Sequence, residues 1–247
     1  MVDGPEASPG RNLSDDVEGR RDIARTLFLS LLAVVLVRAF LIEPFKIPSS
    51  SMMPTLRIGD HIFVSKFSYG LSIPFTKIEF AAWAEPKRGD VVVFLFPKEE
   101  TLHYIKRVVG VPGDRLEFKG KSIYVNGEIV KAERVTDPAL VAKLIGDAEP
   151  SADVYREYLG SAIHFIKHSN RKTYDFSSDT QVEIVPPDKF FVLGDNRDDS
   201  YDSRSWGLVP RDHLKGKAQV IWLSLDHDAP WTGVGKIRWP RCGTLIH

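Results

Sequence analysis

The feature that most constrains this chain is a long apolar segment near its N-terminus. Residues 27–37 carry no charge and only one polar side chain. The wider segment 23–42 contains Arg25 and Arg38 close to its ends, where a long side chain can place its charge outside the apolar zone. A helix of about 20 residues is about 30 Å long, which matches the hydrocarbon core of a bilayer. The segment therefore predicts a transmembrane anchor over residues 23–43.

Two other interpretations compete with an anchor. A cleaved signal peptide needs small residues at a cleavage site soon after its apolar run, and residues 39–43 (Ala-Phe-Leu-Ile-Glu) do not supply them. A buried helix usually carries a polar stripe, which this run lacks. Positive charge is concentrated before the segment, at Arg20, Arg21 and Arg25. The positive-inside rule therefore predicts a single-pass protein with a cytoplasmic N-terminus and its remaining residues on the outer face.

Composition and motif content narrow the function of the rest of the chain. The 247 residues are 43% apolar and 27% charged, as in globular proteins, and 33 basic residues balance 33 acidic ones. A net charge of zero gives no sign of a nucleic-acid partner. Cys242 is the only cysteine, so cysteine usage does not indicate a redox compartment. No zinc-site, nucleotide or dinucleotide motif is present, so we expect neither a metal nor a cofactor.

Short apolar and alternating runs, separated by turn residues, follow the apolar segment. Residues 1–22 are rich in small, polar and charged residues and are predicted to form a disordered cytoplasmic tail. Asn126-Gly127 is typical of a hairpin turn, and residues 137–160 can hold a short helix or two. Strands are expected over residues 61–66, 91–96, 101–110, 115–118, 122–125, 162–167, 180–185, 189–193 and 218–223. The predicted fold class is mainly β, with one N-terminal transmembrane helix followed by an antiparallel β domain.

A loop over residues 67–83 is unusually apolar for a connection. It can fold onto the core, or its aromatic rings can enter the membrane interface, where such rings are favoured. The sequence favours neither interpretation over the other. Its large apolar residues are Phe67, Tyr69, Leu71, Ile73, Phe75, Phe80 and Trp83.

A serine-rich segment bounded by two prolines is the first candidate for chemistry. Residues 48–54 read Pro-Ser-Ser-Ser-Met-Met-Pro. Each proline fixes its own φ and disfavours helix at the residue before it, so the segment is predicted to be non-helical and stiff at both ends. This suits the display of a nucleophilic serine, but it also suits an ordinary loop, because serine favours turns.

Lys106 is the second candidate, because it shares a face of its predicted strand with Tyr104 and Val108. Its ammonium group can reach solvent at the strand end, or burial can keep the amine neutral. Desolvation lowers a lysine pKa from about 10.4 by up to 3–5 units when burial is complete. A neutral amine can accept the proton of a serine hydroxyl, which is the Ser-Lys form of nucleophile activation.

The third candidate is an acidic run over residues 194–204, Gly-Asp-Asn-Arg-Asp-Asp-Ser-Tyr-Asp-Ser-Arg. A calcium loop of the EF-hand type is excluded, because the required glycine and closing glutamate are missing. The run is better explained as a turn that is braced internally. Asp202 and Arg204 can form an ion pair, and Ser200 and Ser203 can donate hydrogen bonds inward.

These pieces together resemble the bacterial type I signal peptidases, also called leader peptidases. The resemblance rests on four motifs in order behind an N-terminal apolar helix: residues 48–54, the Arg-Gly-Asp-Val-Val-Val-Phe stretch at 88–94, Tyr-Ile-Lys-Arg at 104–107 with Gly-Val-Pro-Gly-Asp at 110–114, and residues 194–204. It covers roughly residues 38–114 and 186–222, and a chance match of all four motifs is very rare.

The resemblance implies a role for each matching residue. Ser51 matches the family's nucleophile and Lys106 its general base. Ser49 matches the hydroxyl that forms the oxyanion hole together with the backbone N–H of Ser51. Relatives often have glycine where this chain has Ser50. The serine that orients the lysine and the ion pair that shapes its loop match Ser200, Asp202 and Arg204. Substrate-binding positions match Phe45, Ile47, Met52, Leu56, Val93 and Ile105, each of which is equally consistent with a place in the core.

The resemblance also implies an organisation and a location. It implies an extracytoplasmic peptidase domain over residues 44–247, with a variable β-rich subdomain inserted at about 127–185. The expected protein lies in the bacterial inner membrane and removes signal peptides after small residues, of the Ala-x-Ala type, through an acyl-enzyme. Its expected partners are signal-peptide-bearing preproteins and membrane lipids, close to the export machinery. The alternatives are a specialised maturation peptidase, for example of a pilin, or a membrane-anchored binding protein without catalysis.

Overall fold

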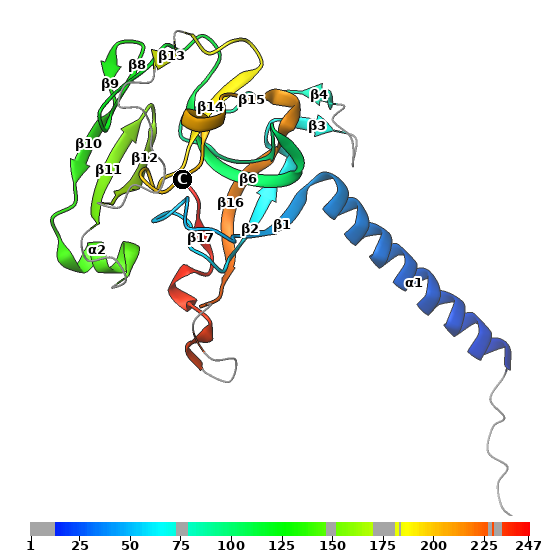
Figure 1. Ribbon diagram of the computed structural model, residues 1–247. Coiled ribbons are helices and arrows are strands. Elements are labelled where there is room, and N and C mark those ends of the chain that lie inside the picture. Colours follow the sequence, from blue (N-terminus) through cyan, green and yellow to red (C-terminus); the bar gives the residue numbers. More distant parts are fainter. Residues whose placement is uncertain are drawn as a thin grey trace, which may run out of the picture.

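The computed structural model describes residues 13–72, 79–146, 152–169, 181–182, 184–226, 229 and 234–247. One long helix projects from a body made almost entirely of β-strands (Figure 1). The prediction of a mainly β, antiparallel fold with little helix is confirmed.

The projecting helix, α1, spans Leu13–Phe40. It begins earlier than predicted, so the expectation of disorder is wrong for residues 13–22, while residues 1–12 lie outside the described part of the chain. Serine and aspartate at 14–16 are residue types that favour a helix N-terminus, which accounts for the earlier start. Within the described residues, no helix has the combination of length and apolar character needed to cross a membrane.

The main sheet has eight strands, all paired antiparallel. Its order is β1-β2-β16-β5-β6-β14-β15, and β17 pairs with β16. These strands span β1 (Ile42–Lys46), β2 (Asp60–Ser65), β5 (Val91–Phe96), β6 (Glu99–Gly110), β14 (Lys189–Leu193), β15 (Val209–Pro210), β16 (Leu214–Ser224) and β17 (Thr244–Leu245).

Three smaller sheets flank the main one. The first is β10 (Lys131–Arg134), β11 (Asp153–Leu159) and β12 (Ala162–His168); the second is β13 (Gln181–Val182), β7 (Leu116–Lys119), β8 (Ser122–Val125) and β9 (Glu128–Ile129); the third is β3 (Gly70–Ser72) with β4 (Glu79–Ala82). The short helices are α2 (Pro138–Ile145), α3 (Ser203–Trp206), η1 (Lys66–Ser68), η2 (Arg211–His213), η3 (Val234–Lys236) and η4 (Trp239–Arg241).

Local sequence explains several of these elements. All six residues of β5 are buried, as expected for a continuous apolar run between two strands. Asn126 and Gly127 both have positive φ, +55° and +84°, which the two-residue turn between β8 and β9 requires. Helix α2 has Asp137 as its N-cap and Pro138 at its first position, both favourable there. The expected strand over 180–185 is described only at Gln181–Val182.

The two faces of the main sheet pack into different apolar clusters. Val91 and Val93 of β5 belong to a cluster with β1, β2 and β16, whereas Val92 and Phe94 belong to one with β14 and α3. Alternation along one strand therefore joins two halves of the core. The aromatic loop after β2 is divided: Tyr69 is buried in the second cluster, whereas Phe67, Phe80 and Trp83 are exposed, and residues 73–78 lie outside the described range.

Candidate active site

The serine-rich segment connects β1 to β2 and is not helical, as its prolines predict. Backbone hydrogen bonds close its two ends: Ile47 N donates to Asp60 O at 2.8 Å, and Gly59 N donates to Ile47 O at 3.0 Å. Inside the segment, Met52 and Leu56 are completely buried. Ser51 lies between the buried Ile47 and Met52, which hold the backbone on either side of it, and 9% of its own surface is exposed.

Lys106 approaches this serine from the middle of β6. Its Nζ lies 2.6 Å from Ser51 Oγ and donates a hydrogen bond of 2.9 Å to the carbonyl of Ile105. The side chain is 4% exposed. Burial lowers the pKa of Lys106 to about 8, against the opposing effect of the Asp202 and Asp195 carboxylates. The structure therefore joins a hydroxyl and an easily deprotonated amine that are 55 positions apart in sequence.

Arginines neutralise both of the carboxylates that would keep the lysine charged. Asp202 receives two hydrogen bonds from the guanidinium of Arg204, at 2.8 and 2.7 Å. Asp195 receives two from Arg107, also at 2.8 and 2.7 Å, in a pair that is fully buried. Burial alone would raise the pKa of Asp195, but the Arg107 guanidinium holds it below its ordinary value. Because each carboxylate is paired with an arginine, burial of the amine has the largest effect on the pKa of Lys106.

The three serines have different surroundings. Ser49 is exposed, and its Oγ lies 3.4 Å from Ser51 Oγ. Ser50 donates a hydrogen bond of 3.2 Å to Asp199 Oδ2. No described residue accepts a hydrogen bond from the Ser51 N–H. A hydroxyl and a backbone donor are thus available beside Ser51, which is the donor set that an oxyanion requires.

The acidic run over residues 194–204 packs against the serine-rich segment. Asn196 holds the serine segment directly: its N–H donates to Ser51 O at 3.1 Å and its Nδ2 to Ser50 O at 3.2 Å. Asp202 caps α3 and accepts a hydrogen bond of 3.1 Å from Gly194 N. The predicted Asp202–Arg204 ion pair is present, and it braces this loop from within.

Ser200 is fully buried in the same run. Its hydroxyl, which was expected to orient the lysine, has no hydrogen-bond partner among the described residues. It packs against Gly194, where an added Cβ would lie 2.2 Å from Ser200 Oγ and 2.4 Å from Ser51 O. Only glycine fits at position 194, because any side chain would separate the loop from the serine segment. The structure places Ser200 beside Ser51, without the expected hydrogen bond to Lys106.

All six residues expected to bind substrate fall in one apolar cluster. Phe45 is only partly buried and packs against its edge, while Ile105 lies nearest to Lys106 in sequence. The other members are almost completely buried, which fits a place in the core: Ile47, Met52, Leu56 and Val93.

Sequence reasoning gave no separate role to Arg107, Asp195 or Asn196. Their positions in the sequence could have indicated a role, because Arg107 directly follows the candidate base and the other two residues lie at the start of the acidic run. Charge pairing across 88 positions, however, becomes visible only in the folded chain.

Comparisons with known proteins agree with the four motifs. The family model described as "Signal peptidase, peptidase S26" matches residues 20–223. The chain belongs to this signal peptidase family. A signal peptidase I of Pseudomonas aeruginosa is 41% identical over 218 residues, 82% of this chain and 72% of that protein. One of Pseudomonas fluorescens is 39% identical over 237 residues, 88% of this chain and 79% of that protein.

The resemblance to type I signal peptidases is therefore confirmed, and neither alternative is favoured. A solved structure of a signal peptidase I from Enterococcus faecalis aligns with 55% of this chain and 98% of its own, at 24% identity and a TM-score of 0.33. That TM-score is too low to support an argument about the fold.

Proposed function

We propose that this chain is a serine endopeptidase that removes N-terminal signal peptides from exported preproteins, with Ser51 as nucleophile and Lys106 as general base. The observation that carries the proposal is the 2.6 Å contact between the Ser51 hydroxyl and a buried lysine amine whose pKa is lowered to about 8. Its membership of the signal peptidase family supports the substrate class.

The chemistry follows from this contact. The neutral amine of Lys106 accepts the Ser51 proton while Oγ attacks the scissile carbonyl carbon. Negative charge develops on the carbonyl oxygen, where the Ser51 N–H and the Ser49 hydroxyl can donate hydrogen bonds. The Lys106 ammonium then gives the proton to the leaving amine, and an acyl-enzyme remains. Lys106 next takes a proton from water, and the resulting attack releases the new carboxyl terminus and regenerates the Ser51 hydroxyl.

The substrate can bind as an added strand. β1 is the first strand of the sheet order, so one of its edges has no strand partner within the described chain. On β6, β5 pairs with residues 104–106, whereas β14 pairs only from Arg107 onward. An extended peptide between these two free edges would lie beside Ser51, held by backbone hydrogen bonds. We expect the bulky residues of the apolar cluster around Ile47 and Ile105 to admit small substrate side chains only.

Cleavage of a purified preprotein with an Ala-x-Ala site tests this function directly. We expect the parent protein to cut once, after the second alanine, so that mass spectrometry finds one mature N-terminus. Replacing that alanine with phenylalanine in the substrate should abolish the cut, because the ring exceeds the space above the cluster. Cutting at other positions, or equal cutting of both substrates, would contradict the assignment.

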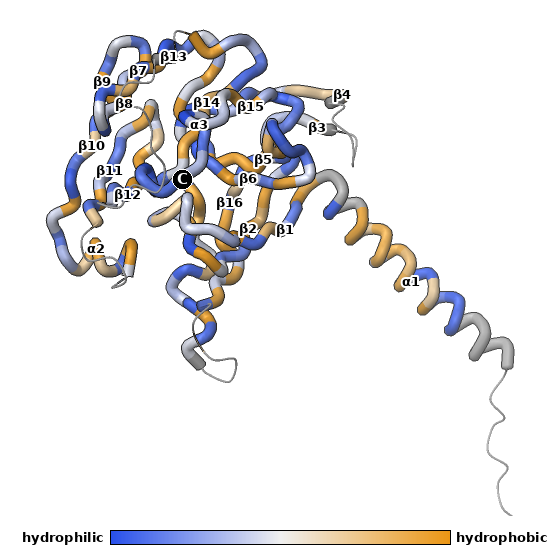
Figure 2. Tube along the Cα trace, viewed as in Figure 1, coloured by the Kyte–Doolittle hydropathy of each residue, from blue (hydrophilic) through white to orange (hydrophobic). Residues whose placement is uncertain are grey.

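We further propose that α1 holds the enzyme in the bacterial inner membrane, with a cytoplasmic N-terminus and the peptidase domain on the outer face. Figure 2 shows that much of the projecting length of α1 is made of apolar residues. Among them, Leu27, Phe28 and Val34 are 63–65% exposed. Such a surface is costly in water at about 25 cal/mol per Å². Arginines before the apolar run favour this orientation.

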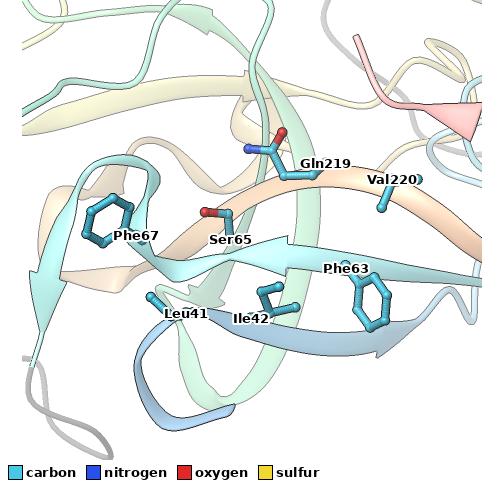
Figure 3. A pocket seen from close by; sticks show the side chains of 7 residues that line it. All are labelled: Leu41, Ile42, Phe63, Ser65, Phe67, Gln219 and Val220. Carbon is cyan, nitrogen blue, oxygen red and sulfur yellow. The ribbon is translucent and has the colours of Figure 1, made fainter. Parts of the chain in front are cut away.

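An apolar pocket lies where α1 leads into β1, and it supports the same proposal. Its volume is about 310 Å³, and side chains from the start of β1, from β2 and from β16 line it (Figure 3). The exposed rings of Phe67 and Trp83, 4.5 Å apart, lie in the loop that follows β2. The lining residues are Leu41, Ile42, Phe63, Ser65, Phe67, Gln219 and Val220. Lipid contact at this surface would hold the free edges of β1 and β6 close to a signal peptide that is itself embedded in the membrane.

Protease protection of intact cells tests this orientation. An epitope tag placed before α1 should resist external protease until the inner membrane is opened, whereas a tag after the C-terminus should be removed once the outer layers are permeable. The reverse pattern would contradict the proposed topology.

A further inference from the structure

We propose that the three-stranded sheet β10-β11-β12 positions the loop over residues 194–204, here called the catalytic loop. Glu157 and His164 are the residues through which the sheet acts on this loop. The inference rests on the proposed function, because it concerns the geometry of Ser51 and Lys106. Nothing in the sequence assigned a role to this sheet, which lies within the inserted region 127–185. Its strands lie beside the catalytic loop that follows β14 (Figure 1).

The first contact is a buried ion pair between the two parts of the chain. Arg197, in the catalytic loop, donates two hydrogen bonds to the carboxylate of Glu157 on β11, at 2.8 and 2.6 Å. Both side chains are 3% exposed. Burial opposes ionisation of Glu157, yet the adjacent Arg197 lowers its pKa to about 2, so the pair is charged throughout the working pH range. A two-point bond of this kind fixes orientation as well as distance.

His164 on β12 extends this pair toward the base. Its Nε2 lies 3.0 Å from Glu157 Oε2, without hydrogen-bond geometry, and 4.0 Å from Asp195 Oδ1. Asp195 in turn binds Arg107, the residue directly after Lys106. Burial and the nearby Arg107 lower the pKa of His164, which favours a neutral ring between the two carboxylates. An uninterrupted set of buried polar contacts thus leads from the inserted sheet to the strand that carries the base.

Backbone pairing ties the same sheet to the loop. Lys167 N donates to Asp195 O at 2.8 Å, and Arg197 N donates to Lys167 O at 2.9 Å, on either side of Asn196. Asn196 is therefore held by β12 on one side while it binds the Ser50 and Ser51 carbonyls on the other. The loop lies between the inserted sheet and the nucleophile, so a shift of the sheet moves Ser51 relative to Lys106.

The loop has a second attachment further along. Asp198 accepts a hydrogen bond of 2.9 Å from Ser169 N, lies 3.2 Å from His168 Nδ1 and pairs with Lys121 at 3.1 Å. These contacts lie nearer the surface than the Glu157 pair. We expect them to keep the loop folded when Glu157 is changed. A change in the geometry of Ser51 and Lys106 can then be measured without loss of the fold.

The test is Glu157→Gln, which keeps the side-chain shape and removes the charge. We expect kcat for preprotein cleavage to fall by up to about 10²-fold, the cost of misplacing reacting groups by about 1 Å. KM should stay within about twofold, because the free edges of β1 and β6 are unchanged. Rates are referred to the folded fraction, measured by circular dichroism. The matched control is Glu133→Gln on β10, whose exposed carboxylate pairs with Lys131, and it should cleave like the parent.

A paired replacement separates positioning from stability. Glu157→Met combined with Arg197→Met removes both charges together, so no buried charge is left unpaired and folding should recover relative to Glu157→Gln. We expect kcat to stay low, because the loop is no longer oriented. Recovery of kcat together with thermal stability would overturn the proposal, as would parent-like kcat in folded Glu157→Gln. If the parent itself fails to cleave, the proposed function falls and this inference falls with it; if only the variants behave like the parent, the inference alone is wrong.

Discussion

Ser51→Ala should abolish preprotein cleavage while leaving the fold intact. Removing the nucleophile of a serine peptidase lowers kcat by about 10⁴–10⁶-fold, since water cannot replace a positioned alkoxide. The side chain is small, and within the described residues its Oγ forms hydrogen bonds with Lys106 and Ser49 only, so alanine leaves almost no cavity. The measurement is single-turnover cleavage with excess enzyme, with circular dichroism as the check on folding. Residual activity above about 1% of the parent would contradict the assignment of Ser51.

The neighbouring serines supply matched controls for this experiment. Ser50→Ala loses only a hydrogen bond to Asp199, and cleavage should change by less than about threefold. Ser49→Ala removes one oxyanion donor and should lower kcat by about 10²–10³-fold with little change in KM. The expected order of activity is therefore parent, Ser50→Ala, Ser49→Ala and Ser51→Ala. Equal effects at all three positions would indicate that the substitutions disturb the whole segment.

The sequence predicted the parts of this site that depend on local chemistry. Two prolines predicted the irregular path of residues 48–54, and strand alternation placed Lys106 among apolar neighbours. The resemblance then distinguished Ser51 from Ser49 and Ser50. Their different partners, Lys106 for one and Asp199 for another, are contacts across 55 and 149 positions. No local pattern encodes such contacts, because they depend on how the whole sheet closes.

Glu157 shows most clearly what local sequence patterns cannot predict. It lies on a strand whose burial pattern does not alternate regularly, and its neighbours in sequence give no sign that its carboxylate is buried against Arg197. A buried charge is stable only when its partner is in place, and that partner lies 40 positions away, in the loop that follows β14. For Ser200, the resemblance predicted a place beside the site and a hydrogen bond to Lys106. The residue lies beside the site, but its hydroxyl has no hydrogen-bond partner among the described residues.

Lys106→Met should also abolish cleavage, and the pH dependence of the parent should show why. The base acts as a neutral amine, and its pKa is lowered to about 8. The charged form therefore accumulates as pH falls below 8, and kcat/KM should decrease by about tenfold per pH unit there. At higher pH the rate should level off. A pH–rate profile with an apparent pKa near 10, the value of a solvated lysine, would contradict the proposal that the amine is buried and neutral.

The same substitution should stabilise the folded protein. The pKa of Lys106 is 10.5 in the unfolded reference and about 8 in the folded chain, so between these values the unfolded state binds more protons. Stability therefore rises as pH increases from about 8 to about 10.5, and below pH 8 the full cost, about 3 kcal/mol, persists. Methionine removes this cost and loses about 1 kcal/mol of hydrogen bonding with Ser51. We expect a net gain of about 1–2 kcal/mol at pH 7.

Urea unfolding of Lys106→Met and the parent, each measured from pH 6 to pH 10.5, tests this expectation. The difference in unfolding free energy should be constant below pH 8 and shrink above it, because only the parent loses a buried charge in that range. Lys217→Met is the control: this lysine forms a partly exposed pair with Asp90, so its loss should not stabilise the protein. A destabilised Lys106→Met at pH 7 would mean that the amine carries little desolvation cost, and the lowered pKa on which the proposed mechanism depends would have to be abandoned.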